Sequence, residues 1–334
     1  MDKSIDKSNL NKTLQDFPQQ FTDALRFTKE IRTLGEFDEV LVCGMGGSAL
    51  PADILATYLT AAGEKLPIRI CRDYTLPSTA NNQTLVLASS YSGNTEETLS
   101  AFAQARKRGL QVVGFSKGGE LLDLCRANNY PCVVYPDLGP DFQPRYASGY
   151  AFAAMASVLA HTGLIKEERL LEIAALPDFL ARYQLAKQGE EAAKQVKGSI
   201  PLVYSSEKYL TSLARIIKIK FNESSKTQSF FNAFPELNHN EMIGFTNLLS
   251  RYTALIFFDP AEHPQTLKRM RITADLLRQK GVNLLNFELQ GESTLQKIFY
   301  GLYLGDWIAY YLALLNGVDP TPVAMVEELK AKLK

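Results

Sequence analysis

Residues 39–53 read EVLVCGMGGSALPAD, an apolar run that leads through a glycine-rich turn into a segment suited to a helix. Residues 40–43 are apolar without alternation, as expected for a strand buried on both faces of a parallel sheet. Gly46 and Gly47 permit close backbone approach, and Ser48 adds a hydroxyl beside the free N–H groups of the coming helix. The stretch therefore predicts an anion-binding turn in an α/β fold.

This turn alone leaves its ligand open. A dinucleotide fingerprint needs a third glycine at position 49, where the chain has Ala49. A P-loop needs Gly-Lys-Ser or Gly-Lys-Thr after the turn, and neither follows. A dinucleotide site and a P-loop nucleotide site are therefore both disfavoured. The alternative that the turn serves only tight packing stays open.

A second turn, rich in hydroxyl groups, follows at residues 84–99, which read TLVLASSYSGNTEETL. Its apolar start predicts another buried strand, and the hydroxyls come between this strand and a helix. Thr95 could cap that helix, with acidic residues in the first helical turn. Capping uses one hydroxyl, however, and the loop holds several. Two strand ends are therefore expected to supply polar groups to one place.

The two motifs together, GMGGSA at 44–49 and SYSGNTEET at 90–98, resemble the sugar isomerase (SIS) domain, a phosphosugar-binding α/β fold. The resemblance implies that the sugar lies against Gly46, Gly47 and Ser48. It implies that the phosphate is held by Ser90, Ser92 and Thr95. The residues alone predict a phosphate, and the sugar is implied by the family.

Composition sets further limits. The chain has 334 residues, 46% of them hydrophobic, which is enough for two domains with sizeable cores. Its 36 basic residues balance 36 acidic ones, so no nucleic-acid partner is indicated. The polar N-terminus lacks a secretory signal, no uninterrupted apolar segment of membrane length is expected, and the four cysteines are dispersed. A cytoplasmic protein without a membrane partner, disulfides, bound metal or cofactor is predicted.

Strand-like and helix-like segments alternate in both halves of the chain, which predicts parallel sheets with right-handed crossovers. We expect two SIS-type, flavodoxin-like α-β-α sandwich domains, at residues 1–164 and 165–334. The second half lacks the glycine signature, so its site is expected to be partly lost. Predicted strands are 39–43, 67–71, 84–88, 111–115 and 131–135, then 201–204, 253–258 and 283–288. Predicted helices of the second half are 262–280, 294–316 and 322–333.

Three further residues could carry chemistry. Arg145, between Pro144 and a small-residue helix, is either a solvated or capping charge or a cation for a phosphosugar. Glu223 lies off the apolar face of its helix, where a surface ion-pair cluster is the alternative. His239 lies in ELNHNE, residues 236–241, without a second histidine at metal-ligand spacing, so proton transfer near neutral pH is its stronger use.

FNESSK at 221–226 and ELNHNE at 236–241 resemble the bifunctional phosphoglucose/phosphomannose isomerase family, and the likeness extends over essentially the whole chain. The resemblance implies a metal-independent aldose–ketose isomerase that interconverts glucose 6-phosphate, and mannose 6-phosphate, with fructose 6-phosphate through an enediol(ate). It implies a homodimer in which the histidine enters from the neighbouring subunit. The implied roles are proton transfer for Glu223, ring opening for His239 with Lys330, charge stabilisation for Arg145 and tolerance of both C2 epimers for Thr321.

One departure and two alternatives stay open. Ser224 and Ser225 stand where family members often have Asn-Ala, which could shift substrate preference. The chain could instead be a non-catalytic phosphosugar-binding regulator, although it has neither room nor basic bias for a DNA-binding domain. It could also isomerise another phosphosugar.

Overall fold

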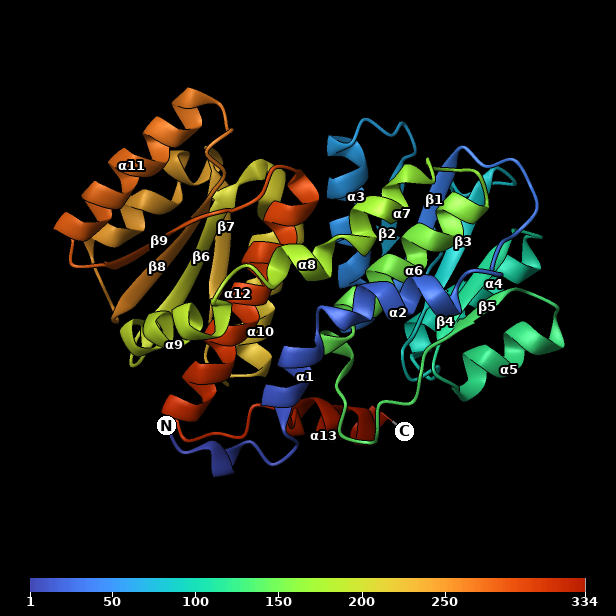
Figure 1. Cartoon of the computed structure of the whole chain (residues 1–334), viewed down its shortest axis with the longest axis horizontal. Coiled ribbons are helices and arrows are strands. Elements are labelled where there is room, and N and C mark those ends of the chain that lie inside the picture. The colour runs from blue at the N-terminus through green and yellow to red at the C-terminus, as the bar shows by residue number, and fades with distance from the viewer. Residues whose placement is uncertain (334) are drawn as a thin grey trace. The chain divides into compact units, whose positions relative to one another are not determined.

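The computed structural model of the protein describes residues 1–333 and shows two compact units (Figure 1). Asp16–Ala181 form what we call the first unit. Met1–Gln15 join the chain from Arg182 onward in the second unit. The division thus falls later than the predicted domain boundary after residue 164, and it places the first residues of the chain with the last half.

Hydrogen bonds to the longest helix explain why the N-terminus belongs to the second unit. The Tyr303 hydroxyl donates to the backbone carbonyl of Leu14 at 2.8 Å. The Tyr310 hydroxyl donates to the Asp6 carboxylate at 3.2 Å. Both tyrosines lie on α12 (Thr294–Leu315), and Leu14 lies on α1 (Leu10–Asp16).

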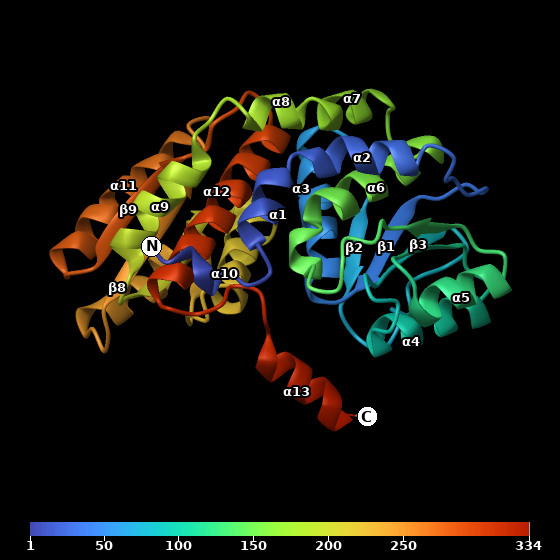
Figure 2. The same cartoon turned by 60° about the horizontal axis from the view of Figure 1, so that its bottom comes forward.

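The first unit is built on a five-stranded parallel sheet in the order β2-β1-β3-β4-β5. All five strands occur where the sequence predicts them: β1 (Glu39–Gly44), β2 (Ile68–Cys71), β3 (Thr84–Ser89), β4 (Val112–Ser116) and β5 (Cys132–Val134). Figure 2 shows α2 (Gln19–Phe27) and α6 (Ser148–His161) over one face, and α4 (Glu96–Lys107) and α5 (Gly119–Ala127) over the other. The strand order reverses between β1 and β3, the place where ligands bind in flavodoxin-like sheets.

The second unit repeats this plan with four parallel strands in the order β7-β6-β8-β9. Three of them, β6 (Ile200–Ser206), β8 (Tyr252–Phe258) and β9 (Asn283–Glu288), confirm predicted strands. The fourth, β7 (Phe230–Phe234), was not predicted, because it is an edge strand within a polar segment and Phe230 at its start is exposed. The helices of this half are α9 (Leu185–Val196), α10 (Arg215–Glu223), α11 (Pro264–Gln279), α12 and α13 (Ala324–Leu333).

The remaining helices are α3 (Leu50–Ala61), which follows β1, and α7 (Glu168–Ala174) and α8 (Leu176–Leu180), which come last in the first unit. Together, the elements confirm the predicted α/β class with two parallel sheets.

Lys297 and Asp306 interrupt the apolar sequence of α12, so this helix does not contradict the prediction that no uninterrupted apolar segment reaches membrane length. Its length and composition would suffice to cross a membrane, but 94% of its most apolar window is buried inside the protein. Ser293 and Gln296 form a capping box at its start, and Gly317, with φ +70°, follows its end. We conclude that α12 is the core helix of the second unit.

Candidate active site

The glycine turn lies at the carboxyl end of β1. The chain leaves Gly44 and passes through a 3₁₀ turn, Gly46–Ser48, into α3. Gly46 has φ +46°, a conformation that glycine adopts without the steric cost other residues bear. A Cβ on Gly47 would lie 2.7 Å from the backbone nitrogen of Arg145. The turn therefore packs directly on Pro144 and Arg145, and the structure brings these predicted site residues together.

The hydroxyl loop between β3 and α4 is organised around Ser90, whose side chain is fully buried. Its Oγ accepts the N–H groups of Gly93 at 3.1 Å and of Thr95 at 3.3 Å, and it is hydrogen-bonded to Thr95 Oγ1 at 2.8 Å. Because two N–H groups use both lone pairs of Ser90, its own proton is donated to Thr95. The Thr95 proton is then left to donate to a ligand.

Thr95 occupies the N-cap position of α4, as predicted, but its side chain makes no capping hydrogen bond. Its hydroxyl is directed to Ser90 instead. Ser92 is exposed, and its Oγ accepts the N–H of Asn94 at 3.2 Å. The alternative that the hydroxyls serve helix capping is therefore wrong for this loop.

The glycine turn and the hydroxyl loop form one surface at the carboxyl ends of β1 and β3. Gly44 and Ser89 are paired in register on adjacent parallel strands. The Ser89 hydroxyl donates to the Ser48 carbonyl at 2.9 Å, and the Tyr91 N–H donates to the Ser48 hydroxyl at 3.0 Å. α3 and α4 both begin here, and neither N-cap residue provides a side-chain hydrogen bond. Helix N–H groups and dipoles therefore converge where the strand order reverses, which favours an anion.

A third loop, which the sequence analysis missed, supports the hydroxyl loop from β4. The Leu121 N–H donates to the Gly93 carbonyl at 2.9 Å, and the Glu120 N–H donates to Asn94 Oδ1 at 3.1 Å. A Cβ on Gly93 would lie 1.8 Å from the Gly118 carbonyl oxygen. The glycine pair 118–119 directly after a predicted strand was the signal that could have found this loop.

We expect Gly93→Ala to damage the anion site. The residue has φ +77°, and the added methyl group would clash with the backbone of Gly118. Positive φ alone costs about 1–3 kcal/mol for a residue with a side chain. The clash adds to this cost and displaces the hydroxyl loop. Calorimetric titration with inorganic phosphate should show weaker binding by the variant.

Gly63→Ala is the matched control, because Gly63 has φ +75° and open space where its Cβ would lie. It should lose stability through strain alone, measured by urea unfolding, and keep wild-type phosphate affinity. Equal phosphate affinity in both variants would contradict the role of the hydroxyl loop.

Arg145 lies in a 3₁₀ turn, Pro144–Tyr146, and is only 3% exposed, so it is not a solvated charge. Its guanidinium stacks on the Tyr146 ring, 4.9 Å from the centroid, and donates from Nη1 to Gln143 Oε1 at 3.4 Å. A buried cation held beside the glycine turn by a stacked ring is suited to a ligand's negative charge.

Glu223 is the last residue of α10 and is half-buried. The ammonium of Lys226 lies 2.8 Å from the Glu223 backbone carbonyl oxygen and donates to it. Lys220, one turn earlier, is buried against Asp306, with Nζ–Oδ1 at 2.7 Å. The alternative that Glu223 belongs to a cluster made only of surface ion pairs is therefore wrong, because the neighbouring Lys220 is buried.

His239 ends a 3₁₀ turn, Glu236–His239, that follows β7, and its side chain is exposed. Glu223, by contrast, ends the helix that precedes β7. The two residues thus lie toward opposite ends of this strand, which at 3.3 Å per residue is about 17 Å long. Within one chain the structure does not bring Glu223 and His239 together.

The carboxylates beside His239 have other partners. Glu236 accepts a hydrogen bond from Asn240 at 2.8 Å, and Glu241 accepts hydrogen bonds from Tyr204 and Asn232. Among residues 1–333, no group of three or more His, Cys, Asp or Glu side chains is arranged to hold a metal ion.

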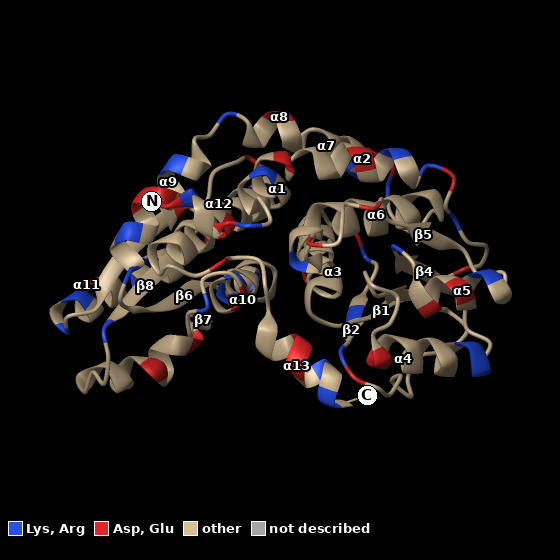
Figure 3. Ribbon diagram, turned by 90° about the horizontal axis from the view of Figure 1, so that it is seen from below, with Lys and Arg blue, Asp and Glu red and all other residues tan. Residues whose placement is uncertain are grey.

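The two C-terminal candidates differ in burial. Thr321 is buried, and its N–H donates to Asp319 Oδ1 at 3.0 Å. Lys330 lies on α13, where it is exposed and pairs with Glu327 at 2.8 Å on the same helix. No residue of α13 between 324 and 333 is buried, and its acidic side chains precede its basic ones (Figure 3).

In the second unit, the carboxyl ends of β6 and β8 correspond to the place of the anion site in the first unit, and a buried carboxylate lies there. Asp259 follows β8 and is buried; it accepts hydrogen bonds from Lys297 at 2.6 Å and Tyr209 at 2.7 Å. Burial opposes ionisation of Asp259, but these donors hold its pKa below the usual value. A carboxylate therefore occupies the place where the first unit would bind an anion.

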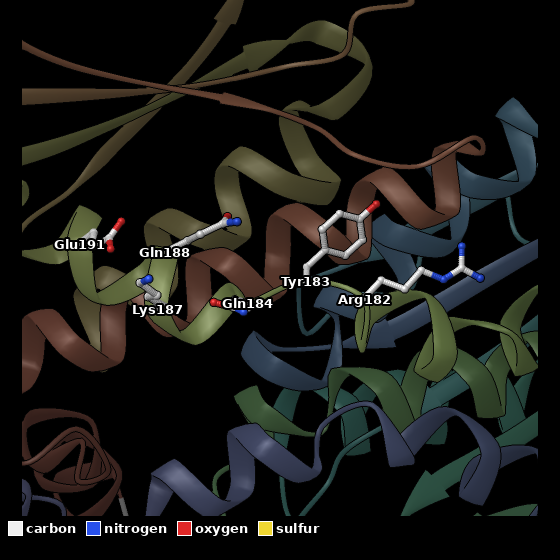
Figure 4. Close-up of a pocket in the computed structure, with 6 residues that line it drawn as sticks. All are labelled: Arg182, Tyr183, Gln184, Lys187, Gln188 and Glu191. Atoms are coloured by element: carbon white, nitrogen blue, oxygen red, sulfur yellow. The ribbon is translucent and has the colours of Figure 1, made fainter.

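A shallow groove on the second unit contains none of the predicted site residues (Figure 4). Its lining comes from the start of α9 and the residues before it: Arg182, Tyr183, Gln184, Lys187, Gln188 and Glu191.

Comparison with known proteins identifies the family. Residues 185–333 match the model of the bacterial phospho-glucose isomerase C-terminal SIS domain. A bifunctional phosphoglucose/phosphomannose isomerase from Caldicellulosiruptor bescii is 32% identical over 96% of this chain and 98% of its own length. One from Aquifex aeolicus is 34% identical over 91% of this chain and 92% of its own length.

The fold has solved counterparts as well. A hypothetical protein from Thermus thermophilus superposes with a TM-score of 0.73 over 96% of this chain and 89% of its own, at 16% identity. Two SIS-type sandwich domains and full-length relatives lead to one conclusion: the chain belongs to the bifunctional phosphoglucose/phosphomannose isomerase family.

Proposed function

We propose that the protein is an aldose–ketose isomerase that converts glucose 6-phosphate and mannose 6-phosphate into fructose 6-phosphate and back. The observation that carries this proposal is the single surface on which two helix N-termini, the hydroxyl loop and buried Arg145 meet. The relatives' names supply the substrates. A cytoplasmic location fits this activity.

In this proposal the phosphate binds the loop that carries Ser90, Ser92 and Thr95. Thr95 donates its remaining proton, while Ser90 fixes the loop through the hydrogen bonds it accepts. The start of α4 adds N–H groups and its dipole. The sugar's reacting end then lies over Gly46, Gly47 and Ser48, where Gly46 has open space in place of a side chain.

The proton transfer is assigned to Glu223. Its carboxylate takes the proton from C2 of the open-chain aldose, the C2–H electron pair forms the C1–C2 double bond, and the carbonyl oxygen becomes an enediolate oxygen. The C2 hydroxyl proton then moves to O1, the electron pair left on O2 forms the C2 carbonyl, and the C1–C2 double bond takes the proton back from Glu223 at C1, which gives the ketose. Arg145 stabilises the developing negative charge. His239 with Lys330 opens the ring, and Thr321 accommodates both configurations at C2.

A homodimer with shared sites is part of the proposal. Its support is the position of Glu223 and His239 toward opposite ends of β7, because one chain cannot then place both on the same sugar. A second copy can supply the histidine.

The experiment that tests the function is an isomerase assay on each aldose phosphate separately. We expect purified protein to form fructose 6-phosphate from glucose 6-phosphate and from mannose 6-phosphate, and we expect EDTA to leave both rates unchanged. Formation of product from only one aldose would restrict the substrate range. Tight fructose 6-phosphate binding without turnover would favour a regulatory role and contradict the proposal.

A further inference from the structure

A buried ion pair lies one helical turn before the proposed base. Lys220 on α10 and Asp306 on α12 are joined at 2.7 Å between Nζ and Oδ1, and each side chain is only 3% exposed. Taking two charges out of water is costly, and apolar residues of similar volume often serve stability equally well. Stability alone is therefore a weak reason for this pair.

The pair is the last of three close contacts between α12 and the segment that runs through α10 (Figure 1). A Cβ on Gly301 would lie 2.7 Å from Leu213 Cδ1, and a Cβ on Gly305 would lie 2.6 Å from Ile217 Cγ1. The two glycines let this segment approach α12 closely. Lys220 and Asp306 then fix the position at which the contact reaches the end of α10.

The residues that follow Glu223 are hydrogen-bonded both to α10 and to the end of α12. The Ser224 N–H donates to the Lys220 carbonyl at 2.8 Å, which continues the helical turn past the base. The Asn316 amide, just beyond α12, donates to the Ser225 carbonyl at 3.3 Å and to the Thr227 hydroxyl at 3.1 Å. The backbone on both sides of Glu223 is thereby tied to α12 or its end.

We propose that Lys220 and Asp306 are positioning residues for Glu223 in the isomerisation. The pair holds the end of α10 so that the Glu223 carboxylate reaches both C1 and C2 of the bound sugar. Neither residue needs to touch the substrate. A small misplacement of a catalytic group can cost about a hundredfold in rate, so the effect should appear in kcat. This inference rests on the proposed role of Glu223.

The test is the double variant Lys220→Met/Asp306→Leu, which removes both charges and leaves no buried charge unpaired. We expect kcat for fructose 6-phosphate to fall by about tenfold or more, with KM within about twofold of wild type, because orientation and not binding is lost. Urea unfolding should show a folded protein. Lys220→Arg keeps the positive charge but not the geometry of the ion pair. Its kcat should lie between that of the double variant and that of the wild type.

The matched control is Lys297→Met/Asp259→Leu, since Lys297 and Asp259 form a comparably buried pair at 2.6 Å that is remote from α10 in the chain. Its kcat should stay at the wild-type value. Wild-type kcat in the Lys220/Asp306 double variant, or an equal loss in both double variants, would overturn the inference.

Glu223→Gln separates this inference from the proposed function. If that variant keeps turnover, the base assignment fails and the positioning role fails with it. If that variant is inactive while the Lys220/Asp306 double variant has wild-type kcat, only the positioning role is wrong. Should the double variant not fold, Lys220→Arg decides, and an unchanged kcat in that variant contradicts the inference.

Discussion

Glu223→Gln should lower kcat for fructose 6-phosphate by at least about a hundredfold, the lower range for loss of a general base. Gln has nearly the same shape as Glu but cannot accept the proton from C2 or C1. The variant should still bind fructose 6-phosphate, because the proposed phosphate contacts, Ser90, Ser92 and Thr95, lie in the first unit. Steady-state kinetics and calorimetric binding would measure the two properties separately.

Glu190→Gln is the control for this exchange. Glu190 lies on α9 and pairs with Lys194 on the same helix, at 2.7 Å. Losing such a partly exposed pair costs at most about 1 kcal/mol of stability. Its kcat should match wild type. Retained turnover in Glu223→Gln would show that another group moves the proton.

The sequence predicted the strands that are buried on both faces. β1 and β3 read as uninterrupted apolar runs, and every residue of β3 is buried. β7 escaped prediction because it lies within a polar segment and its first residue is exposed. The attachment of residues 1–15 to the second unit also escaped, since it depends on Tyr303 and Tyr310, far along the chain.

The candidate site also contains features that the sequence could predict and features that it could not. Its glycine and hydroxyl turns are local motifs, so their meeting at adjacent strand ends could be predicted from a parallel sheet. Lys220, by contrast, is paired with Asp306 on a helix far along the chain, so the residues around Glu223 do not reveal this ion pair. The support that Gly118 gives to Gly93 likewise depends on a neighbouring strand. A local sequence pattern does not reveal contacts between segments that are far apart in the chain.

Heterodimers of two inactive variants should recover activity. In one chain, Glu223 lies before β7 and His239 after it. In the proposed homodimer, a complete site therefore combines Glu223 of one copy with His239 of the other. Glu223→Gln and His239→Ala homodimers should each be inactive. A heterodimer of the two, isolated with two affinity tags, contains one intact site and should show about half of the wild-type kcat per dimer.

The reciprocal heterodimer pairs a wild-type chain with a chain that carries both substitutions. If the sites are shared, each site in it lacks either Glu223 or His239, so this heterodimer should be inactive. If each chain instead held a complete site, the wild-type chain would keep about half of the activity per dimer. The two heterodimers contain the same two substitutions and differ only in whether these lie on one chain or on two. Activity in the reciprocal pair together with inactivity in the first would exclude a shared site.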